Sequence, residues 1–466
     1  MHTLQQLRNG ALAGAVRLQL SCGLTEFPPE IFDLADTLEI LDLSGNDLTT
    51  LPADLPRLAK LRIIFCSSNH FTVLPAVLGA CKQLTMIGFK SNRIRAVPGA
   101  ALPPSLRWLI LTDNQITALP AEIGLCTQLQ KLMLAGNELS DLPMELAACR
   151  KLELLRIAAN RLVALPPWLL EMPRLAWLAY AGNPFSAADD AASTGDANPA
   201  GIAWKQLRLE QKLGEGASGV IHQAVLHERA PDPAADRQEQ PATGARAVAV
   251  KLFKGAITSD GLPRCELAAW IGAGAHANLI PVLGEVRDHP DGVHACVMTL
   301  VEPGYRNLAG PPSLDSCTRD IYPDDKSFTP AALLRLAGGI ASAAHHLHGR
   351  GILHGDLYAH NILHTGAGDA LLGDFGAASR FAVDAAHAVA LQRLEVRAFG
   401  LLLAELMARC DDGEASGDIL TNLQTLQRAC TQAVPAARPL FLEVARHITD
   451  TAQRVSRQDT SSRQNG

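Results

Sequence analysis

A 23-residue pattern that recurs through the first 185 residues limits the fold of this chain more than any other feature. In a clear copy of the pattern, closely spaced leucines are followed by an asparagine and a Leu-Pro pair, at Leu38, Leu41, Leu43, Asn46, Leu48, Leu51 and Pro52. The asparagine returns after 23 residues, or once after 22, at Asn69, Asn92, Asn114, Asn137, Asn160 and Asn183. A single copy cannot bury its own apolar side, so stacked copies must share one continuous core. The pattern therefore predicts a solenoid in which each turn contributes a short strand.

This repeat resembles the leucine-rich repeat, in the variety that carries Leu-Pro in its second half. The resemblance implies an α/β leucine-rich-repeat solenoid, which we expect over residues 1–185. The recurring asparagine amides can bond backbone groups of adjacent turns where the chain leaves each strand. Cysteines share one position of the repeat at Cys81, Cys126 and Cys149. We expect them to pack as small apolar residues rather than to form disulfides.

The repeat also predicts a binding surface. Strand side chains alternate, so the third and fifth positions of each copy should point out of the core on the concave side. These positions are unusually apolar and include Ile63, Phe65, Met86, Trp108, Ile110, Met133 and Trp177. A contiguous apolar stripe usually marks an interaction site, so we expect a protein or peptide partner there. Alternatively, the stripe packs against the second domain of this chain, or some of its side chains fold into the core.

Composition bounds the remaining possibilities. The chain has 466 residues, of which 48% are hydrophobic, and a net charge of −6. These values favour at least two domains with true cores and give no support for a nucleic-acid-binding face. No apolar run reaches the roughly 18 residues that a membrane span requires, and the N-terminus lacks a secretory segment. We therefore expect a cytoplasmic protein.

Changes in composition divide the chain into four parts. After the repeats, residues 186–203 are mostly small and acidic and are expected to form a flexible linker. A second domain is expected over residues 204–450, followed by a polar, disordered tail at 451–466. Within the second domain, the Pro- and Asp-rich residues 304–327 indicate a loop.

The second domain carries polar motifs at fixed spacing. In His354-Gly355-Asp356, the aspartate stands five residues before Asn361. Asp374-Phe375-Gly376 begins 13 residues after Asn361. Upstream, glycines 214, 216 and 219 form a G-x-G-x-x-G loop between two strand patterns, and Val248-Ala249-Val250-Lys251 follows. This order and spacing resemble the protein kinases. The resemblance extends over about residues 205–450, through the segments His276–Ile280, Glu395–Gly400 and Ala437–Pro439.

The kinase resemblance implies an α+β bilobal domain that uses ATP and Mg²⁺. It assigns Asp356 to orient the substrate hydroxyl and accept its proton, and Asn361 and Asp374 to hold metal. Lys251 would bind the phosphates and pair with Glu266, with Asp260 as the alternative partner. The nucleotide site would comprise Gly214, Gly216, Ser218, Gly219, Ile221, Ala249, Lys251, Met298 and Leu363, with Met298 behind the adenine. Trp270 would stack near Phe375 and His354. This stack would link the position of the helix that carries Glu266 to the metal-binding loop at residues 374–376.

The sequence departs from the kinase pattern at three places. Gly355 replaces the arginine that usually receives an activation-segment phosphate, and Tyr358 stands where a lysine usually neutralises the transferring phosphoryl group. Between Gly376 and Glu395 the one hydroxyl is Ser379, and no A-P-E motif is present to supply a partner for Arg438. Activity should therefore not require phosphorylation of this segment, and turnover should be low.

Taken together, the motifs favour an ATP- and Mg²⁺-dependent protein kinase whose repeats recruit a protein substrate or regulator. Serine or threonine is expected as the acceptor, although the motifs do not separate these from tyrosine. The alternative is a pseudokinase, a nucleotide-binding or inert scaffold whose work is done by the repeat surface.

Overall fold

The computed structural model describes residues 2–191, 201–216, 218–228, 244–255, 257–258, 260–411 and 416–464. The chain forms two compact units, Met1–Phe185 and Ser186–Gly466, and each is described by itself. The middle of the expected linker, residues 192–200, lies outside the described residues.

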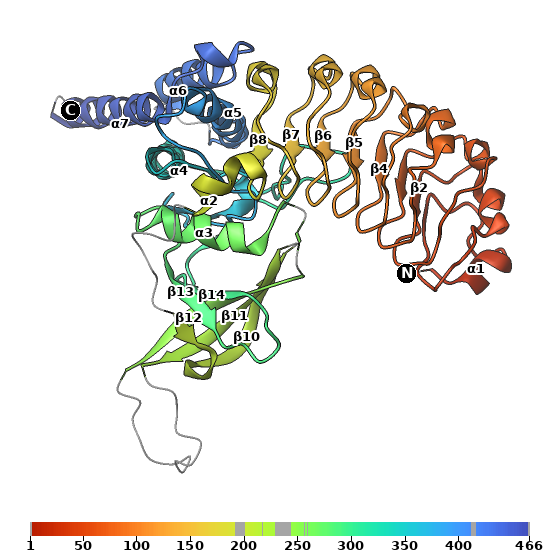
Figure 1. Ribbon diagram of the computed structural model, residues 1–466. Coiled ribbons are helices and arrows are strands. Elements are labelled where there is room, and N and C mark those ends of the chain that lie inside the picture. The colour runs from red at the N-terminus through yellow and green to blue at the C-terminus, as the bar shows by residue number, and fades with distance from the viewer. Residues whose placement is uncertain are drawn as a thin grey trace, which may run out of the picture. The chain divides into compact units, whose positions relative to one another are not determined.

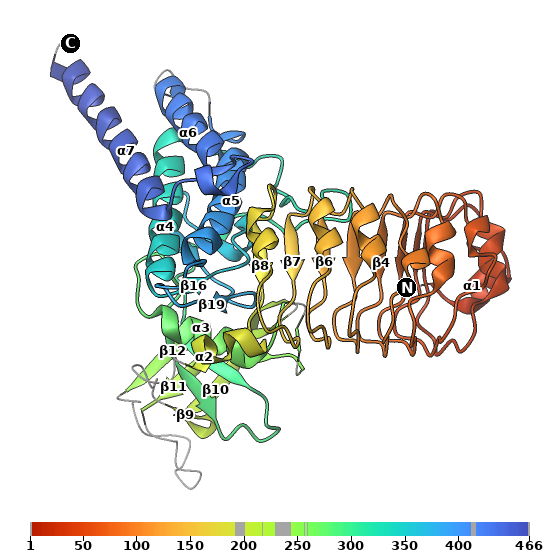
Figure 2. The same ribbon diagram turned by 45° about the horizontal axis from the view of Figure 1, so that its top comes forward.

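The first unit is an eight-stranded parallel sheet in which the strands follow chain order (Figures 1 and 2). After helix α1 (Leu4–Arg8), the strands are β1 (Arg17–Gln19), β2 (Ile40–Asp42), β3 (Ile63–Phe65), β4 (Met86–Gly88), β5 (Trp108–Ile110), β6 (Lys131–Met133), β7 (Leu154–Arg156) and β8 (Trp177–Ala179). Short 3₁₀ turns alternate with them: η1 (Pro29–Leu34), η2 (Leu55–Arg57), η3 (Ala76–Ala80), η4 (Gly99–Ala101), η5 (Ala121–Leu125), η6 (Met144–Ala148), η7 (Pro167–Glu171) and η8 (Pro184–Ser186). From β2 to β8, each strand covers the third to fifth positions of one repeat, which confirms the solenoid.

Two features of the repeat hold the turns together. The fourth position is fully buried in every copy, at Leu41, Ile64, Ile87, Leu109, Leu132, Leu155 and Leu178. The asparagines link neighbouring turns as expected. Asn137 Nδ2 donates to the carbonyls of Leu111 and Leu134, both at 2.9 Å, and its Oδ1 accepts the N–H of Ile116 at 3.0 Å. Cys81, Cys126 and Cys149, which share a repeat position, have free thiols and are buried.

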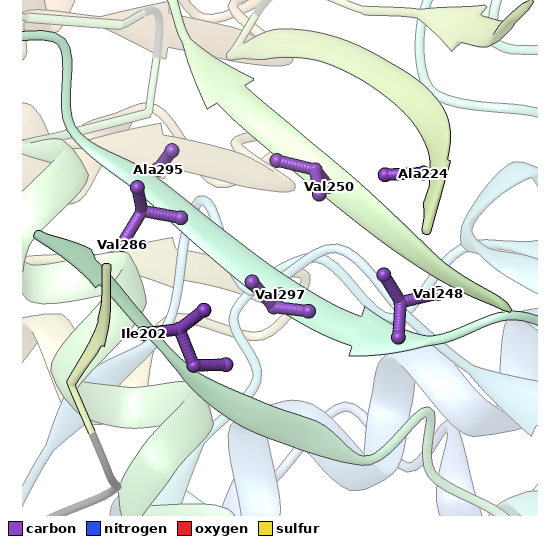
Figure 3. Close-up of a cluster of buried hydrophobic side chains, with 7 residues drawn as sticks. All are labelled: Ile202, Ala224, Val248, Val250, Val286, Ala295 and Val297. Atoms are coloured by element: carbon purple, nitrogen blue, oxygen red, sulfur yellow. The ribbon is translucent and has the colours of Figure 1, made fainter. Parts of the chain in front are cut away.

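The second unit begins with a six-stranded sheet in the order β10-β11-β12-β14-β13-β9. Its strands are β9 (Ile202–Ala203), β10 (Leu207–Glu215), β11 (Gly219–His227), β12 (Ala245–Phe253), β13 (Val282–Arg287) and β14 (Ala295–Thr299). Only the β13–β9 pair is parallel. Small β-branched and alanine side chains fill the core of this sheet, at Ile202, Ala224, Val248, Val250, Val286, Ala295 and Val297 (Figure 3).

The rest of this unit is mainly helical. Its helices are α3 (Pro263–Ala273), α4 (Pro330–Gly349), α5 (Ala388–Met407), α6 (Ser416–Cys430) and α7 (Phe441–Gln464), with turns η10 (Trp204–Gln206), η11 (Ala359–Asn361) and η12 (Pro435–Ala437). Two small sheets carry the loops of the site: β15 (Arg306–Asn307) with β17 (Ile362–His364) and β18 (Ala370–Leu372), and β16 (Ile352–Leu353) with β19 (Ser379–Arg380). Figure 1 shows the large sheet at one end of the unit and helices α4 to α7 at the other. This arrangement confirms the α+β bilobal fold.

The structure differs from the expected linker and tail. Helix α2 (Ala187–Ala191) forms within the first expected linker residues and contacts α3 and β19, while β9 pairs with β13 at the linker's other end. Helix α7 continues to Gln464, although we expected disorder after residue 450. Buried Ile448 and Thr451 anchor this helix, and it packs on α4.

Among the described residues, no helix combines the length and the apolar character that crossing a bilayer requires. The expected cytoplasmic location stays a prediction.

Candidate active site

Lys251 and Glu266 form the centre of the candidate site. Lys251 lies on β12 and Glu266 on α3, and both side chains are buried. The Lys251 Nζ forms an ion pair with Glu266 Oε1 and lies 3.4 Å from Asp374 Oδ1. Burial disfavours the charged amine, but the Asp374 and Glu266 carboxylates raise the pKa of Lys251 above its ordinary value. The predicted partner of Lys251 is therefore Glu266 and not Asp260.

The glycine-rich loop connects β10 to β11. Its backbone closes on itself through the Gly216 N–H, which donates to the Gly219 carbonyl at 2.9 Å. A Cβ added at Gly214 or Gly216 would meet no atom within 4 Å, whereas one at Gly219 would lie 2.5 Å from the Leu252 carbonyl oxygen. Gly219 is thus required for packing between strands, and the other two glycines face open space. Glycines of that second kind allow phosphate oxygens to approach the backbone.

The adenine side of the expected site is set by strand register. Met298 on β14 lies opposite Ala249 on β12, and both side chains are buried. Ile221 on β11 lies opposite Lys251, and Ser218, just before that strand, is buried. Leu363 lies on β17, next to residues 354–361, which the kinase resemblance assigns as the catalytic loop. The register places Ala249, Met298 and Ile221 on neighbouring strands around Lys251, while contact of these residues with a nucleotide stays a prediction.

Glu395 on α5 supports the catalytic loop. Its carboxylate accepts the backbone N–H of His354 at 3.2 Å and that of Gly355 at 2.6 Å. It also accepts Nε2–H of His348 at 2.7 Å. Burial opposes ionisation of Glu395, but His348 and these donors keep its pKa below the ordinary value. Gly355 adopts a φ of 73°, in the left-handed region that glycine enters without steric cost.

Asn361 contacts the predicted catalytic carboxylate. The Asn361 Nδ2 donates to the Asp356 carbonyl at 2.9 Å and to Asp356 Oδ2 at 2.7 Å. These bonds use the amide nitrogen and leave the amide oxygen of Asn361 available to a cation. They also fix Asp356 relative to the start of β17.

Aromatic stacking joins α3 to the metal loop. The Trp270 and Phe375 rings stack with centroids 5.4 Å apart, and the His354 ring lies 5.2 Å from Phe375 on centroids. The indole N–H of Trp270 donates to the Ile280 carbonyl at 3.0 Å. The structure therefore confirms the expected stack. Asp374, beside it, has a φ of 52°, and strained backbone of this kind in a non-glycine residue is typical of functional loops.

The donors around Asp374 fit a hard divalent cation. Asp374 supplies carboxylate oxygens and Asn361 an amide oxygen, which are the ligand types that Mg²⁺ prefers. The Asp374 side chain is 46% exposed, so it is accessible to a ligand. Desolvation raises its pKa, but Lys251 and the Gly376 N–H outweigh that effect and hold the pKa below its ordinary value. Asp374 is therefore ionised at neutral pH, as metal binding requires.

Sequence reasoning missed a third carboxylate near this loop. Asp320, from the loop over residues 304–327, bonds the His360 ring through Oδ1 to Nδ1 at 2.8 Å and accepts the His360 backbone N–H at Oδ2 at 3.0 Å. The His360 Nε2 lies 3.9 Å from Asp356 Oδ2. Burial lowers the pKa of His360, but the carboxylates of Asp320 and Asp356 raise it above its ordinary value. Because no fixed spacing connects Asp320 to the motif, no sequence signal could have found it.

Arg438, whose partner the sequence left open, bonds backbone carbonyls. Its Nε donates to the Gln432 carbonyl at 2.9 Å and its Nη1 to the Arg393 carbonyl at 3.1 Å. Burial and the nearby Arg397 lower the pKa of Arg438 to about 9.

The apolar stripe of the repeat unit is narrower than expected. Ile63, Met86 and Trp177 are only 2–3% exposed, so the expectation that they face solvent was wrong. The alternation of strand side chains predicts the face of a residue but not what covers it.

The half-buried members of the stripe are Phe65, Trp108, Ile110 and Met133. The Trp108 indole N–H donates to Met133 Sδ at 3.4 Å, and the Lys131 ammonium lies 4.3 Å from the Trp108 ring centre. Phe65 covers Gly88, where an added Cβ would lie 2.5 Å from its ring. The strand register aligns Phe65, Gly88, Ile110 and Met133 in one row across neighbouring strands, and Trp108 contacts Met133 at the end of that row.

Comparison with known families agrees with this geometry. Residues 207–399 match the model of a family described as protein tyrosine and serine/threonine kinase. Residues 104–162 and residues 37–58 match two leucine-rich-repeat families. No curated protein matched the chain.

Proposed function

We propose, from the premise that this chain joins leucine-rich repeats to a protein kinase domain, that it transfers the γ-phosphoryl group of ATP to a protein hydroxyl. Kinase domains in general use ATP and a divalent metal, and we propose Mg²⁺ as that metal. The observation that carries the proposal is the buried Lys251–Glu266 pair beside Asp374. It supports an assembled site, because kinases need this pair and the metal-binding Asp in place together.

The residues divide the work of phosphoryl transfer. Bound Mg²⁺ and ATP would supply the reactive phosphoryl group with its charge partly neutralised. Lys251 holds the phosphates, and Asn361 and Asp374 hold the metal. Asp356 orients the substrate hydroxyl and accepts its proton. We propose serine or threonine as the acceptor, on the resemblance alone.

We also propose that the site is active without phosphorylation of the segment after Gly376. Ser379 has the only hydroxyl between Gly376 and Glu395, and it is fully buried in β19. A buried hydroxyl is not accessible to a second kinase. In kinases that are switched on by phosphorylation, an arginine at the position of Gly355 binds the phosphate. This chain therefore lacks both that arginine and an accessible hydroxyl in residues 377–394.

A scaffold function remains the second candidate, because Tyr358 is buried and cannot supply the charge of a lysine. Labelling of protein substrates with radioactive ATP, with wild type and Asp356→Asn side by side, separates the two. We expect labelling by the wild type and a decrease of about 10²-fold or more in the variant. Equal labelling would overturn the catalytic role of Asp356. No labelling by either protein, with Mg·ATP still bound, would establish the scaffold.

We propose that Phe65, Trp108, Ile110 and Met133 recruit an apolar segment of a protein or peptide. The variant Trp108→Glu should lower labelling of a recruited protein without changing turnover on a short generic peptide. Val163→Glu is the matched control, because Val163 is 75% exposed on the same unit and lies outside the stripe. Equal labelling of the recruited protein by both variants would reject this surface.

A further inference from the structure

The catalytic loop has an unusual arrangement of side chains around Asp356. Tyr358, which stands where kinases usually have a lysine, is buried, and its ring lies 5.1 Å from the His360 ring on centroids. The ionisable side chain near the predicted catalytic carboxylate is instead the imidazole of His360, two residues later. Its Nε2 lies 3.9 Å from Asp356 Oδ2, the same oxygen that accepts Nδ2–H of Asn361 at 2.7 Å.

His360 is held on its other side by a dedicated partner. The Asp320 side chain is fully buried, and its two oxygens bond the ring Nδ1 and the backbone N–H of His360. This double contact fixes both the ring plane and the backbone one residue before Asn361. The ring is bonded at Nδ1 and its own backbone N–H is bonded to the same carboxylate, which limits the freedom of the ring to rotate and favours precise positioning.

The loop over residues 304–327 is itself fixed on both sides of Asp320. Gly310 and Ile321 exchange backbone hydrogen bonds of 2.8 and 3.0 Å. The Tyr322 hydroxyl donates to Glu405 Oε2 on α5 at 3.1 Å, and the Arg409 guanidinium lies 3.9 Å from the Tyr322 ring centre. These contacts place the Asp320 carboxylate against the catalytic loop without help from the motif residues.

We infer that Asp320 and His360 form a positioning pair for Asp356, which makes the loop over residues 304–327 a working part of the active site. This inference rests on the proposed kinase function. The pair acts through Asp356 and Asn361 and does not itself need to touch the substrate. Asn361 donates to Oδ2 of Asp356, and the His360 ring, oriented by Asp320, lies 3.9 Å from the same oxygen. Together the two side chains limit the orientations open to the carboxylate.

A positioning role and a purely structural role affect different measured constants. Loss of a structural contact would lower the melting temperature and nucleotide affinity together. Loss of a positioning contact lowers kcat, because small displacements of a reacting group cost rate while ground-state binding is kept. Asp320 and His360 act as one unit, so their substitutions should not be additive.

The test compares Asp320→Asn, His360→Gln and the double variant in the full-length protein with Mg·ATP and a peptide substrate. Asp320→Asn preserves the size of the buried side chain and removes its charge. We expect kcat to fall about tenfold or more, as for partners that orient catalytic groups, with the Kd for Mg·ATP and the peptide KM changed less than about twofold. The double variant should be no slower than the slower single variant. Asp324→Asn is the matched control, an exposed carboxylate in the same loop.

Each result separates this inference from the proposed function. If the wild type is active, three results would overturn the positioning pair alone. These are an unchanged kcat in Asp320→Asn, losses of kcat that add in the double variant, and a loss of kcat in Asp324→Asn equal to that in Asp320→Asn. A fall in Mg·ATP affinity that matches the fall in kcat would assign Asp320 to structural support only and so reject the inference. A wild type that binds Mg·ATP without transferring phosphate would end the proposed function, and this inference with it.

Discussion

At the scale of single residues, Gly355 shows why the catalytic loop departs from the usual kinase sequence. The φ of this residue is 73°, a region that costs other L-residues about 1–2 kcal/mol. Glu395 holds the same backbone by accepting the Gly355 N–H. Glycine therefore avoids strain that an arginine would introduce here. An arginine at this position would also have no phosphate to bind, because Ser379, the one hydroxyl between Gly376 and Glu395, is buried.

The prediction from this backbone is that Gly355→Ala lowers the free energy of unfolding by about 1 kcal/mol. Gly417→Ala is the control with the opposite sign. Gly417 is the second residue of helix α6, its φ is not positive, and an added Cβ there would meet no atom within 4 Å. Alanine should stabilise that helix by up to about 1 kcal/mol. Urea unfolding of the two variants measures both effects, and a stabilised Gly355→Ala would contradict the role of this φ.

Glu405 makes a separate prediction about pH. Burial and the neighbouring Asp320 raise the pKa of Glu405 to about 7. A raised carboxyl pKa means that the folded state binds the proton more tightly than the unfolded state, so the free energy of unfolding falls as pH rises from about 4.5 to about 7. Glu405→Gln keeps an acceptor for the Tyr322 hydroxyl and removes this ionisation.

We therefore expect Glu405→Gln to be more stable than the wild type above pH 7, by about 1–2 kcal/mol after allowance for partial exposure. The two proteins should be equally stable near pH 4. Denaturant unfolding at a series of pH values measures the difference. Parallel curves across the whole range would show that Glu405 does not titrate in this way.

At the scale of elements, the asparagines decide the stability of the repeat turns. Asn137 is buried and satisfies two carbonyls and one N–H of the backbone. Asn137→Ala leaves these three groups without their partner, and each buried unsatisfied group costs about 1–3 kcal/mol. We expect a loss of about 3 kcal/mol or more in the free energy of unfolding of the repeat unit, measured by its thermal transition. Glu145→Ala, an exposed substitution in the next turn, should change it by less than about 0.5 kcal/mol.

The elements that the sequence predicts are those with a period or a motif. The 23-residue period predicts β2 to β8 residue by residue, because burial of the fourth position fixes the register. The kinase motifs predict the Lys251–Glu266 pair and the Trp270–Phe375 stack, since spacing along strand and helix sets those contacts. Asp320 lies in a loop without spacing rules. Helix α2 also escaped prediction, because its small and acidic residues resemble a linker until the contacts with α3 and β19 are known.

At the scale of the whole molecule, the chain consists of two units with different kinds of core. The repeat unit has a continuous column of leucines and isoleucines, and its stability is a sum over neighbouring turns. The second unit has a separate core within its six-stranded sheet. Because each unit buries its own apolar residues, we expect each to unfold as its own cooperative transition.

Calorimetry of the intact chain tests this expectation together with the nucleotide site. We expect a non-hydrolysable ATP analogue with Mg²⁺ to bind only the folded second unit. At 100 times its Kd it should then stabilise that unit by about 2.7 kcal/mol and raise one transition by several degrees. The other transition should stay in place and should be the one that Asn137→Ala lowers. Lys251→Met, which removes the ammonium that pairs with Glu266 and faces Asp374, should abolish most of the shift caused by the nucleotide. A nucleotide that raises both transitions equally, or that raises the transition sensitive to Asn137→Ala, would show that ligand binding is not confined to the second unit.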